Sequence, residues 1–245
     1  MRALTEDALL DGRVRLIQPA RGHRAGTDAV LLAAAAPLEP GDRVVDAGAA
    51  TGAVGLMLAR RASIRVVFVE RDPGLAELCR RNLALNGCAG QVAEADLIDR
   101  STWPAAELEP GSADLVATNP PFLETGHGRA SPDPARAAAH VLPEGGLAQW
   151  LKACAALLKP GGRLVLVQRA DRLADCLGGL GRGFGAVRLR FVHGRADAPA
   201  ARLVLTATKG SRAPLAVDPP LVLHDAEGRF TPLAEAIHRG DALLE

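Results

Sequence analysis

The chain has 245 residues, of which 48% are hydrophobic and 23% are charged, and its formal net charge is +1. This composition fits one large folded domain with a sizeable core and excludes a disordered or fibrous chain. A net charge so close to zero provides no global attraction to nucleic acid, so any surface that binds a polyanion must come from local clustering.

The cysteines and the N-terminus indicate the compartment. Cys79, Cys88, Cys154 and Cys176 form no CxxC pair, which argues against a zinc site and favours buried thiols in a reducing compartment. The first residues are too polar for a signal peptide, and the longest apolar run, residues 29–36, is too short to span a bilayer. We expect a soluble cytoplasmic protein with no metal and no membrane contact.

The N-terminal part predicts a hairpin and a helix. Residues 4–14 have the pattern of a hairpin at a sheet edge that turns at Asp11-Gly12. A loop rich in Gly and Arg then leads to a helix over residues 29–36. Thr27 or Asp28 is placed to cap that helix, and a ligand contact is the alternative role for Asp28.

A strand, turn, helix and strand follow in order. Residues 44–47 form a buried strand that runs into Gly48-Ala-Ala-Thr-Gly52, residues 53–61 are helical, and residues 65–70 form a second strand. A second helix covers residues 73–86. This unit predicts parallel strands joined by a right-handed crossover.

The glycine spacing after the first core strand indicates which class of nucleotide or nucleoside ligand the unit could bind. It matches neither the G-x-G-x-x-G dinucleotide fingerprint nor the Gly-Lys-Ser/Thr of a P-loop. An acid at the end of the next strand, here Glu70, instead suits a nucleoside without pyrophosphate, because a carboxylate accepts from both ribose hydroxyls. A solvated acid at a strand end is the alternative role for Glu70.

The next two strands also end in polar residues. Residues 91–96 predict a third strand that ends in Asp96, followed by a partly helical connection. The fourth strand, residues 113–118, leads directly into Asn119-Pro120-Pro121-Phe122, where the prolines stop the strand. A carboxamide is thereby held at the carboxyl end of a strand, which is the edge where open α/β sheets bind ligands.

The rest of the chain continues the alternation. The loop at residues 123–143 is long enough to predict a lid or a segment that contacts substrate. The later elements are a helix at 147–158, a strand at 163–167, a helix at 171–180, an antiparallel hairpin of 186–193 with 201–208, and a tail strand and helix within 219–237. Together these elements predict an α/β fold with a Rossmann-like, mostly parallel sheet of seven strands, helices on both faces and the hairpin at the sheet end.

These motifs resemble those of S-adenosylmethionine-dependent methyltransferases. The resemblance rests on Asp46-x-Gly48, Glu70, Asp96 and the Asn-Pro-Pro-Phe motif, which is typical of enzymes that methylate amino or amide nitrogens. Residues 26–32, 190–193 and 220–232 are further similar to the tRNA adenine-N6 methyltransferase family that modifies the purine beside the anticodon of a valine tRNA.

The resemblance covers nearly the whole chain. It implies a single methyltransferase domain, residues 1–245, with an N-terminal segment at 1–40, a catalytic core at 41–210 and a tail at 211–245 packed on the core. It also implies S-adenosylmethionine as cofactor, tRNA as partner and cytoplasmic tRNA modification. We expect a monomer or a dimer.

The resemblance assigns the cofactor contacts. It places Glu70 at the ribose hydroxyls, Asp96 at the adenine amine, and Asp46, Gly48 and Gly52 at the methionine end. The full predicted set is Asp28, Asp46, Gly48, Ala50, Gly52, Glu70, Arg71, Asp96, Leu97 and Asn119. A helix cap is the alternative role for Asp96. Relatives usually carry Gly at the position of Ala50, where a Cβ would crowd the methionine portion or shift the loop.

The predicted catalytic residues are Asn119, Pro120, Pro121 and Phe122. The Asn119 carboxamide oxygen and the Pro120 carbonyl would each accept an N–H of the target amine, which turns its lone pair toward the methyl group. Phe122, where Tyr is common, would stack on the target ring.

A basic segment predicts contact with RNA. Between residues 182 and 212 seven Arg and Lys residues accompany one acid, Asp197. Phosphate binding explains this cluster, and protection of a sheet edge against aggregation explains it nearly as well. The predicted RNA-binding residues are Arg129, Arg136, Arg188, Arg190 and Arg195.

Three other functions compete with methylation of a tRNA adenine. The same Asn-Pro-Pro-aromatic site methylates a glutamine amide in release-factor methyltransferases, although those carry a helical N-terminal domain and only about 40 residues precede the first core strand here. Guanine-N2 methylation of ribosomal RNA is a second alternative. A non-catalytic module that binds the cofactor or RNA is the third, and the joint presence of Glu70, Asp96 and Asn119 argues against it.

Overall fold

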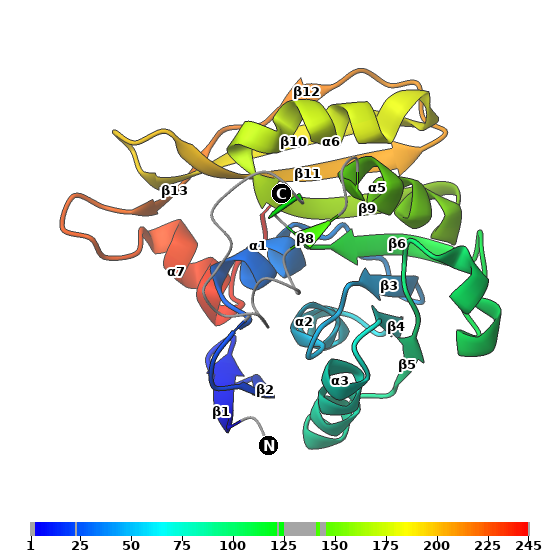
Figure 1. The fold of residues 1–245 in the computed structure, drawn as a ribbon. Helices are drawn as coiled ribbons and strands as arrows, with labels where there is room; N and C mark the ends of the chain where they lie inside the picture. Colours follow the sequence, from blue (N-terminus) through cyan, green and yellow to red (C-terminus); the bar gives the residue numbers. More distant parts are fainter. Residues whose placement is uncertain (1–2, 23, 122, 125–140, 143–145, 245) are drawn as a thin grey trace.

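A nine-stranded mixed sheet forms the centre of the protein (Figure 1). The computed structural model describes residues 3–22, 24–121, 123–124, 141–142 and 146–244. The strand order is β12-β10-β11-β9-β6-β3-β4-β5, with β13 also paired to β10. The strands are β3 (Arg43–Ala47), β4 (Arg65–Glu70), β5 (Gly90–Glu94), β6 (Ala113–Thr118), β9 (Leu158–Arg169), β10 (Phe184–Arg195), β11 (Ala200–Lys209), β12 (Ala216–Val217) and β13 (Leu221–His224).

The predicted fold class is confirmed. Strands β5, β4, β3, β6 and β9 are parallel, and β11 runs antiparallel to both β9 and β10. The β10–β11 hairpin lies at one end of the sheet as predicted, but the sheet has nine strands where seven were predicted, because the tail returns along the outer edge of β10. There β12 and β13 add two short parallel strands, and the Asp218 N–H donates to the Leu189 carbonyl at 2.7 Å.

Helices cover both faces of the sheet. One face carries α1 (Thr27–Ala35), α2 (Ala53–Arg61) and α3 (Pro73–Leu85), and the other carries α5 (Gly146–Leu157) and α6 (Leu173–Leu180). The helix α7 (Pro232–Arg239) packs beside α1 (Figure 1). Successive strand residues point to opposite faces, so Val44 is buried against the first set of helices and Val45 against the second.

The N-terminal hairpin forms as predicted but does not lie at the edge of the main sheet. Strands β1 (Leu4–Leu9) and β2 (Val14–Pro19) make a separate two-stranded sheet that rests on α3. The fully buried Asn82 of α3 joins them, because its Oδ1 accepts from the Ile17 N–H at 2.7 Å and its Nδ2 donates to the Ile17 carbonyl at 2.9 Å. Its Nδ2 also donates to the Thr51 carbonyl at 2.9 Å.

We predict that Asn82→Ala lowers the free energy of unfolding by about 2–4 kcal/mol, because it leaves the buried Thr51 carbonyl and the half-buried N–H and carbonyl of Ile17 without this partner. Denaturant unfolding measures this loss. Asn86→Ala is the matched control one turn further along α3. Its side chain bonds the main chain of Arg15 at an exposed position, so its loss should be about 1 kcal/mol or less. Equal losses in the two variants would contradict the prediction.

Several predicted boundaries differ from the structure. Strand β5 ends at Glu94, two residues before the predicted end, and the connection after it contains two short 3-10 turns, Arg100–Thr102 and Pro104–Ala106. The predicted long loop contains a two-residue pair, β7 (Leu123–Glu124) with β8 (Val141–Leu142). The rest of that loop, and with it the lid prediction, lies outside the described residues.

The thiols are free, and Cys79, Cys154 and Cys176 are buried while Cys88 is half-buried. Within the described ranges, no group of His, Cys, Asp and Glu side chains is arranged to hold a metal ion. No described helix is both long and apolar enough to cross a membrane.

Candidate active site

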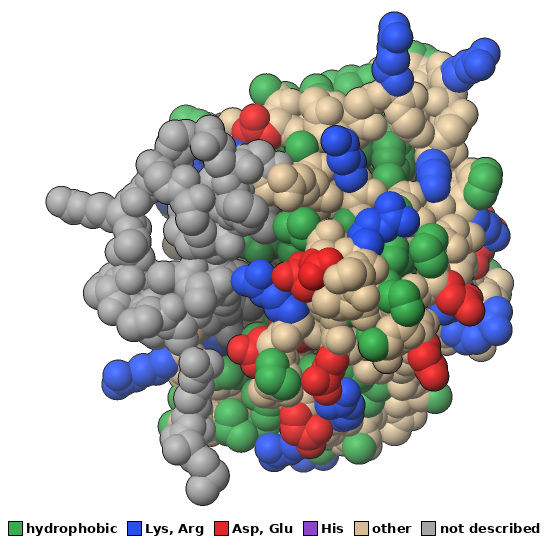
Figure 2. Space-filling view, turned by 45° about the vertical axis from the view of Figure 1, so that its right-hand side comes forward, with side chains coloured by type: hydrophobic (Ala, Val, Ile, Leu, Met, Phe, Trp, Pro, Cys, Tyr) green, Lys and Arg blue, Asp and Glu red, His purple; other side chains and the backbone are tan. Residues whose placement is uncertain are grey.

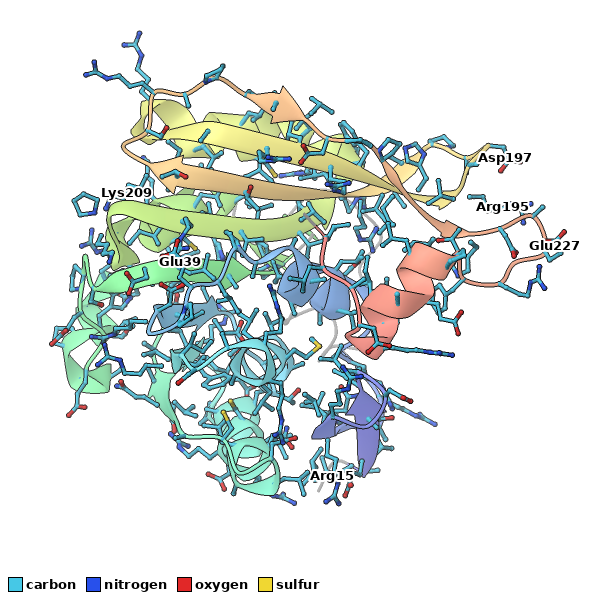
Figure 3. All side chains as sticks on the ribbon, turned by 180° about the vertical axis from the view of Figure 1, so that it is seen from behind. Arg15, Glu39, Arg195, Asp197, Lys209 and Glu227 are labelled. Atoms are coloured by element: carbon cyan, nitrogen blue, oxygen red, sulfur yellow. The ribbon has the colours of Figure 1, made fainter. Side chains whose placement is uncertain are left out.

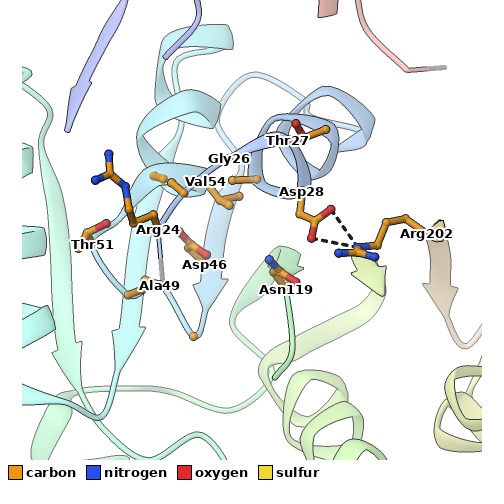
Figure 4. Close-up of a pocket in the computed structure, with 15 residues that line it drawn as sticks. Arg24, Gly26, Thr27, Asp28, Asp46, Ala49, Thr51, Val54, Asn119 and Arg202 are labelled. Carbon is orange, nitrogen blue, oxygen red and sulfur yellow. Dashed lines mark hydrogen bonds and ion pairs between the residues drawn. The ribbon is translucent and has the colours of Figure 1, made fainter. Parts of the chain in front are cut away.

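A cavity of about 270 Å³ opens at the carboxyl ends of β3 and β6 (Figure 4). These strands are adjacent and parallel, so the loop after β3 and Asn119 after β6 meet at one edge. The cavity brings together five residues of the predicted cofactor set, namely Asp28, Asp46, Gly48, Ala50 and Asn119.

Asp46 is almost fully buried at the end of β3. Its Oδ2 accepts from the Gly55 N–H in the first turn of α2 at 2.8 Å. Burial raises the pKa of Asp46 to about 7, and the charge of Glu70 acts in the same direction against the Gly55 hydrogen bond. Gly48 has φ +77°, and a Cβ on it would lie 2.9 Å from the Trp150 ring, so only glycine fits there.

Glu70 holds the loop after β3 from the neighbouring strand. Its Oε2 accepts from the Ala50 N–H at 2.8 Å, and its Oε1 accepts from the Asp72 N–H at 2.8 Å. Burial raises the pKa of Glu70. Ala50 has φ +48°, a left-handed conformation that glycine adopts without strain and that costs alanine about 1 kcal/mol. The carboxylate keeps further acceptor capacity for hydroxyl groups, since each oxygen has two lone pairs.

Asp96, Arg71 and Leu97 lie along the same sheet edge beyond β4 and β5. The Asp96 Oδ1 accepts from the Ile98 N–H at 2.9 Å, and its Oδ2 lies 3.6 Å from the Arg71 Nη1. One oxygen therefore closes a turn and the other faces a cation. The alternative role as a helix cap is not the one observed, because Asp99 caps the following 3-10 turn. The Leu97 side chain is buried in the core, so any contact of this residue with a ligand would use its backbone.

Asn119 is positioned by a hydrogen-bond chain through the residue before it. The Thr118 hydroxyl donates to the Ala47 carbonyl at 2.8 Å and accepts from the Trp150 Nε1 at 2.9 Å. The Asn119 Oδ1 is buried and has no hydrogen-bond partner among the described residues. Such an atom costs about 1–3 kcal/mol unless a ligand supplies a donor. Pro120 and Pro121 follow as predicted, and Phe122 lies outside the described residues.

Asp28 has a different local role from the predicted helix cap. Gly26 occupies the N-cap of α1, and no side chain caps that end. The Asp28 carboxylate instead accepts from the Arg202 Nε, at 3.1 Å to Oδ1 and 3.0 Å to Oδ2. Figure 4 shows this ion pair in the cavity wall near Asn119. The reason is spatial, since the third residue of the antiparallel strand β11 reaches the same sheet edge as the start of α1.

Sequence reasoning missed two cations of the cavity, Arg24 and Arg202. Arg24 was part of a loop without a recognisable motif, and it pairs with Asp7 of β1 at 2.7 Å. Arg202 was counted in the basic segment. Knowledge of the strand order would have placed Arg202 at the cavity, because the amino end of an antiparallel strand lies beside the carboxyl ends of the parallel strands.

The basic segment is more neutral than the sequence indicated. Arg188 and Arg190 lie 2.6 and 3.8 Å from Asp218, just beyond the segment whose acids were counted, and the Arg190 side chain is only 14% exposed. Lys209 donates to two backbone carbonyls of the α5–β9 junction. Arg195 pairs with Asp197 at the opposite end of the hairpin from Lys209 (Figure 3).

Basic side chains still gather on one part of the surface. In Figure 2 most charged side chains in the upper half, at the height of β10, β12 and α6, are Lys or Arg, and the lower half mixes both signs. Arg188 and Arg195 are about half exposed. Arg129 and Arg136 lie outside the described residues.

The doubly wound sheet, the loop after β3 and the strand-end Asn-Pro-Pro motif define an S-adenosylmethionine-dependent methyltransferase. The chain belongs to the methyltransferase small domain family, whose model matches residues 25–191. Class, fold and methyl donor thus agree with the sequence prediction.

Individual relatives extend this result. The chain is 33% identical to a tRNA1(Val) (adenine(37)-N6)-methyltransferase of Aeromonas hydrophila over 85% of each chain. It is 35% identical to the Porphyromonas gingivalis protein of the same name over 62% of this chain and 61% of that protein. The predicted resemblance to that family is therefore confirmed. A solved structure, described as a predicted O-methyltransferase from Agrobacterium tumefaciens, is 30% identical with a TM-score of 0.74 and covers 89% of this chain and 98% of its own.

Proposed function

We propose that this protein transfers the methyl group of S-adenosylmethionine to the exocyclic N6 of an adenine in tRNA. The observation that carries the proposal is the Asn119 Oδ1, which is buried and has no hydrogen-bond partner among the described residues. Asn119 is one of the residues that line the cavity at the end of β6. A carboxamide oxygen in that position fits an N–H donor of a substrate. The names of the curated relatives favour adenine in tRNA as that substrate.

Asn119 would activate the amine by accepting one of its N–H groups. The lone pair of an adenine amine is delocalised into the ring, so the nitrogen is a poor nucleophile. If Asn119 Oδ1 and the Pro120 carbonyl accept the two N–H groups, the nitrogen becomes tetrahedral and its lone pair turns out of the ring plane. The same acceptors stabilise the positive charge that develops on nitrogen, and the proton leaves to water after transfer.

The residues along the sheet edge fit the cofactor. S-adenosylmethionine, when bound, supplies an electrophilic methyl group on a sulfonium. Asp46 offers a carboxylate for the methionine ammonium, Glu70 for the ribose hydroxyls and Asp96 for the adenine amine, in the order of strands β3, β4 and β5. Gly48 and Gly52 let the backbone of the loop after β3 turn tightly, because their φ angles of +77° and +87° favour glycine.

We predict that Glu70→Gln raises the dissociation constant for S-adenosylmethionine by about 10-fold, because an amide replaces one acceptor oxygen by a donor. Isothermal titration measures this change. Glu94→Gln, at the exposed end of β5, where the carboxylate pairs with Arg80 instead, is the matched control and should leave the affinity unchanged. The assignment of Glu70 is wrong if both variants bind as tightly as the original protein.

Methyl transfer from labelled cofactor to total RNA and to total protein tests the proposed function. We expect N6-methyladenosine in the tRNA fraction after nucleoside analysis. Label in a glutamine amide of protein, or N2-methylguanine in ribosomal RNA alone, would replace the proposal by one of the two competing activities. Absence of cofactor binding would rule out the enzyme and leave only a non-catalytic module that binds RNA.

A further inference from the structure

The tail between β13 and α7 forms a tightly closed turn that the active site does not use. His224 and Phe230 pair as an antiparallel bridge across it. Inside the turn, Asp225 Oδ1 accepts from the Glu227 and Arg229 N–H groups at 3.0 and 2.9 Å. The Thr231 hydroxyl then caps α7 and donates to the Val222 carbonyl at 2.8 Å. This closure fixes the direction in which Phe230 points.

Three rings stack at the base of this turn. The Phe230 ring lies 4.9 Å from His224 and 4.3 Å from His238, measured between centroids, with interplanar angles of 19° and 26°. We call His224, Phe230 and His238 the ring stack. Phe230 is 38% exposed, in a chain in which only 3% of the residues are Phe, Trp or Tyr. The ring stack therefore presents aromatic surface to solvent.

The ring stack is connected to the rim of the cavity. The His238 Nδ1 lies 2.7 Å from the Ala234 carbonyl, and its Nε2 lies 3.3 Å from the Thr27 hydroxyl. Thr27 begins α1 and lines the cavity that also contains Asn119. Figure 1 shows α7 alongside α1, and Figure 4 shows Thr27 on the same helix as Asp28.

We propose that the ring stack binds an unpaired nucleobase of the RNA next to the one in the active site. This inference rests on the proposed methylation of an RNA adenine. A base that turns into a pocket leaves its neighbours without stacking partners, and protein rings commonly replace them. Phe230 stacks on His238, which contacts Thr27 at the start of α1, so the ring stack borders the helix end that lines the cavity.

The charges around the ring stack favour stacking over phosphate binding. Arg229 pairs with Asp225 and Glu227, and Arg239 pairs with Glu235. Arg195, which reaches the Ala226 carbonyl, pairs with Asp197. Figure 3 shows Arg195, Asp197 and Glu227 at the same end of the molecule. Because the cations here are matched by acids, the contact should depend little on salt concentration.

Phe230→Leu tests this proposal, because it keeps an apolar side chain and removes the ring. We expect the dissociation constant for an unmodified tRNA transcript to rise roughly 5- to 150-fold, by a similar factor at low and high salt. The dissociation constant for S-adenosylmethionine and the thermal unfolding midpoint should not change. Phe230→Trp should retain RNA affinity. Leu233→Ala, at an exposed apolar residue of α7 three positions after Phe230, is the matched control and should bind RNA as the original protein does.

Unchanged RNA affinity in Phe230→Leu, or an equal loss in Leu233→Ala, would overturn the role of the ring stack while the proposed function stands. A lower unfolding midpoint with normal RNA affinity would identify the rings as packing between α7 and β13. If the original protein neither binds nor methylates RNA, the proposed function and this inference fail together.

Discussion

Replacing Asn119 by alanine should lower kcat by about 10²- to 10³-fold, the loss typical when one preorganised polar group that stabilises developing charge is removed. The Oδ1 of Asn119 is buried with no partner among the described residues, so the substrate amine would supply its hydrogen bond. The dissociation constant for S-adenosylmethionine should change only a few-fold, because Asp46 and Glu70 remain. Single-turnover methylation of unmodified tRNA measures the rate.

Two further variants sharpen this test. Asn119→Asp keeps an acceptor oxygen in the same place and should recover part of the rate lost in the alanine variant. Asn86→Ala removes a carboxamide from the far end of α3 and should leave kcat unchanged. If Asn119→Ala keeps more than about a tenth of the rate, activation of the amine does not depend on this acceptor.

The central elements follow from local signals in the sequence. Helix α2 (Ala53–Arg61) and strands β4 and β6 have the predicted bounds, because apolar runs there are closed by glycine, proline or charged residues. The place of the N-terminal hairpin was not predictable in this way. It is set by Asn82, whose bonds to Ile17 span 65 residues and leave no periodic trace. The tail strands likewise depend on the free edge of β10.

The cavity was only partly predictable for the same reason. Asp46, Gly48 and Asn119 share an edge because parallel neighbouring strands end together, and that rule needs only the order of elements. The pairing of Asp28 with Arg202 joins residues 174 positions apart, and nothing near either residue in the sequence indicates it. The strength of the basic segment was overestimated because Asp218 lies outside it in sequence and beside Arg188 and Arg190 in space.

Asp46→Asn should make the protein without cofactor more stable at pH 8, although it alters a predicted binding residue. Burial raises the pKa of Asp46 to about 7 in the folded protein, against 3.8 for an Asp side chain exposed to water in the unfolded chain. A raised acid pKa contributes stability below pH 4 that is lost as the pH rises to about 7. The difference corresponds to about 4 kcal/mol as an upper bound, since one pKa unit is worth about 1.4 kcal/mol. The asparagine in the variant does not ionise, so the stability of the variant does not fall between about pH 4 and pH 7 in this way. The asparagine side-chain oxygen can still accept from the Gly55 N–H.

Denaturant unfolding at pH 5 and pH 8 measures this effect, with Asp42→Asn as the matched control. Asp42 is buried just before β3, but both its oxygens accept from Arg163 at 2.9 and 2.8 Å, so the same substitution there should destabilise the fold. Saturating S-adenosylmethionine should then stabilise the original protein at pH 8 more than Asp46→Asn, because its ammonium would pair with the buried carboxylate. If the cofactor raises the free energy of unfolding of both proteins by the same amount, Asp46 does not face that ammonium. The carboxylate would then serve only to accept the Gly55 N–H in the first turn of α2.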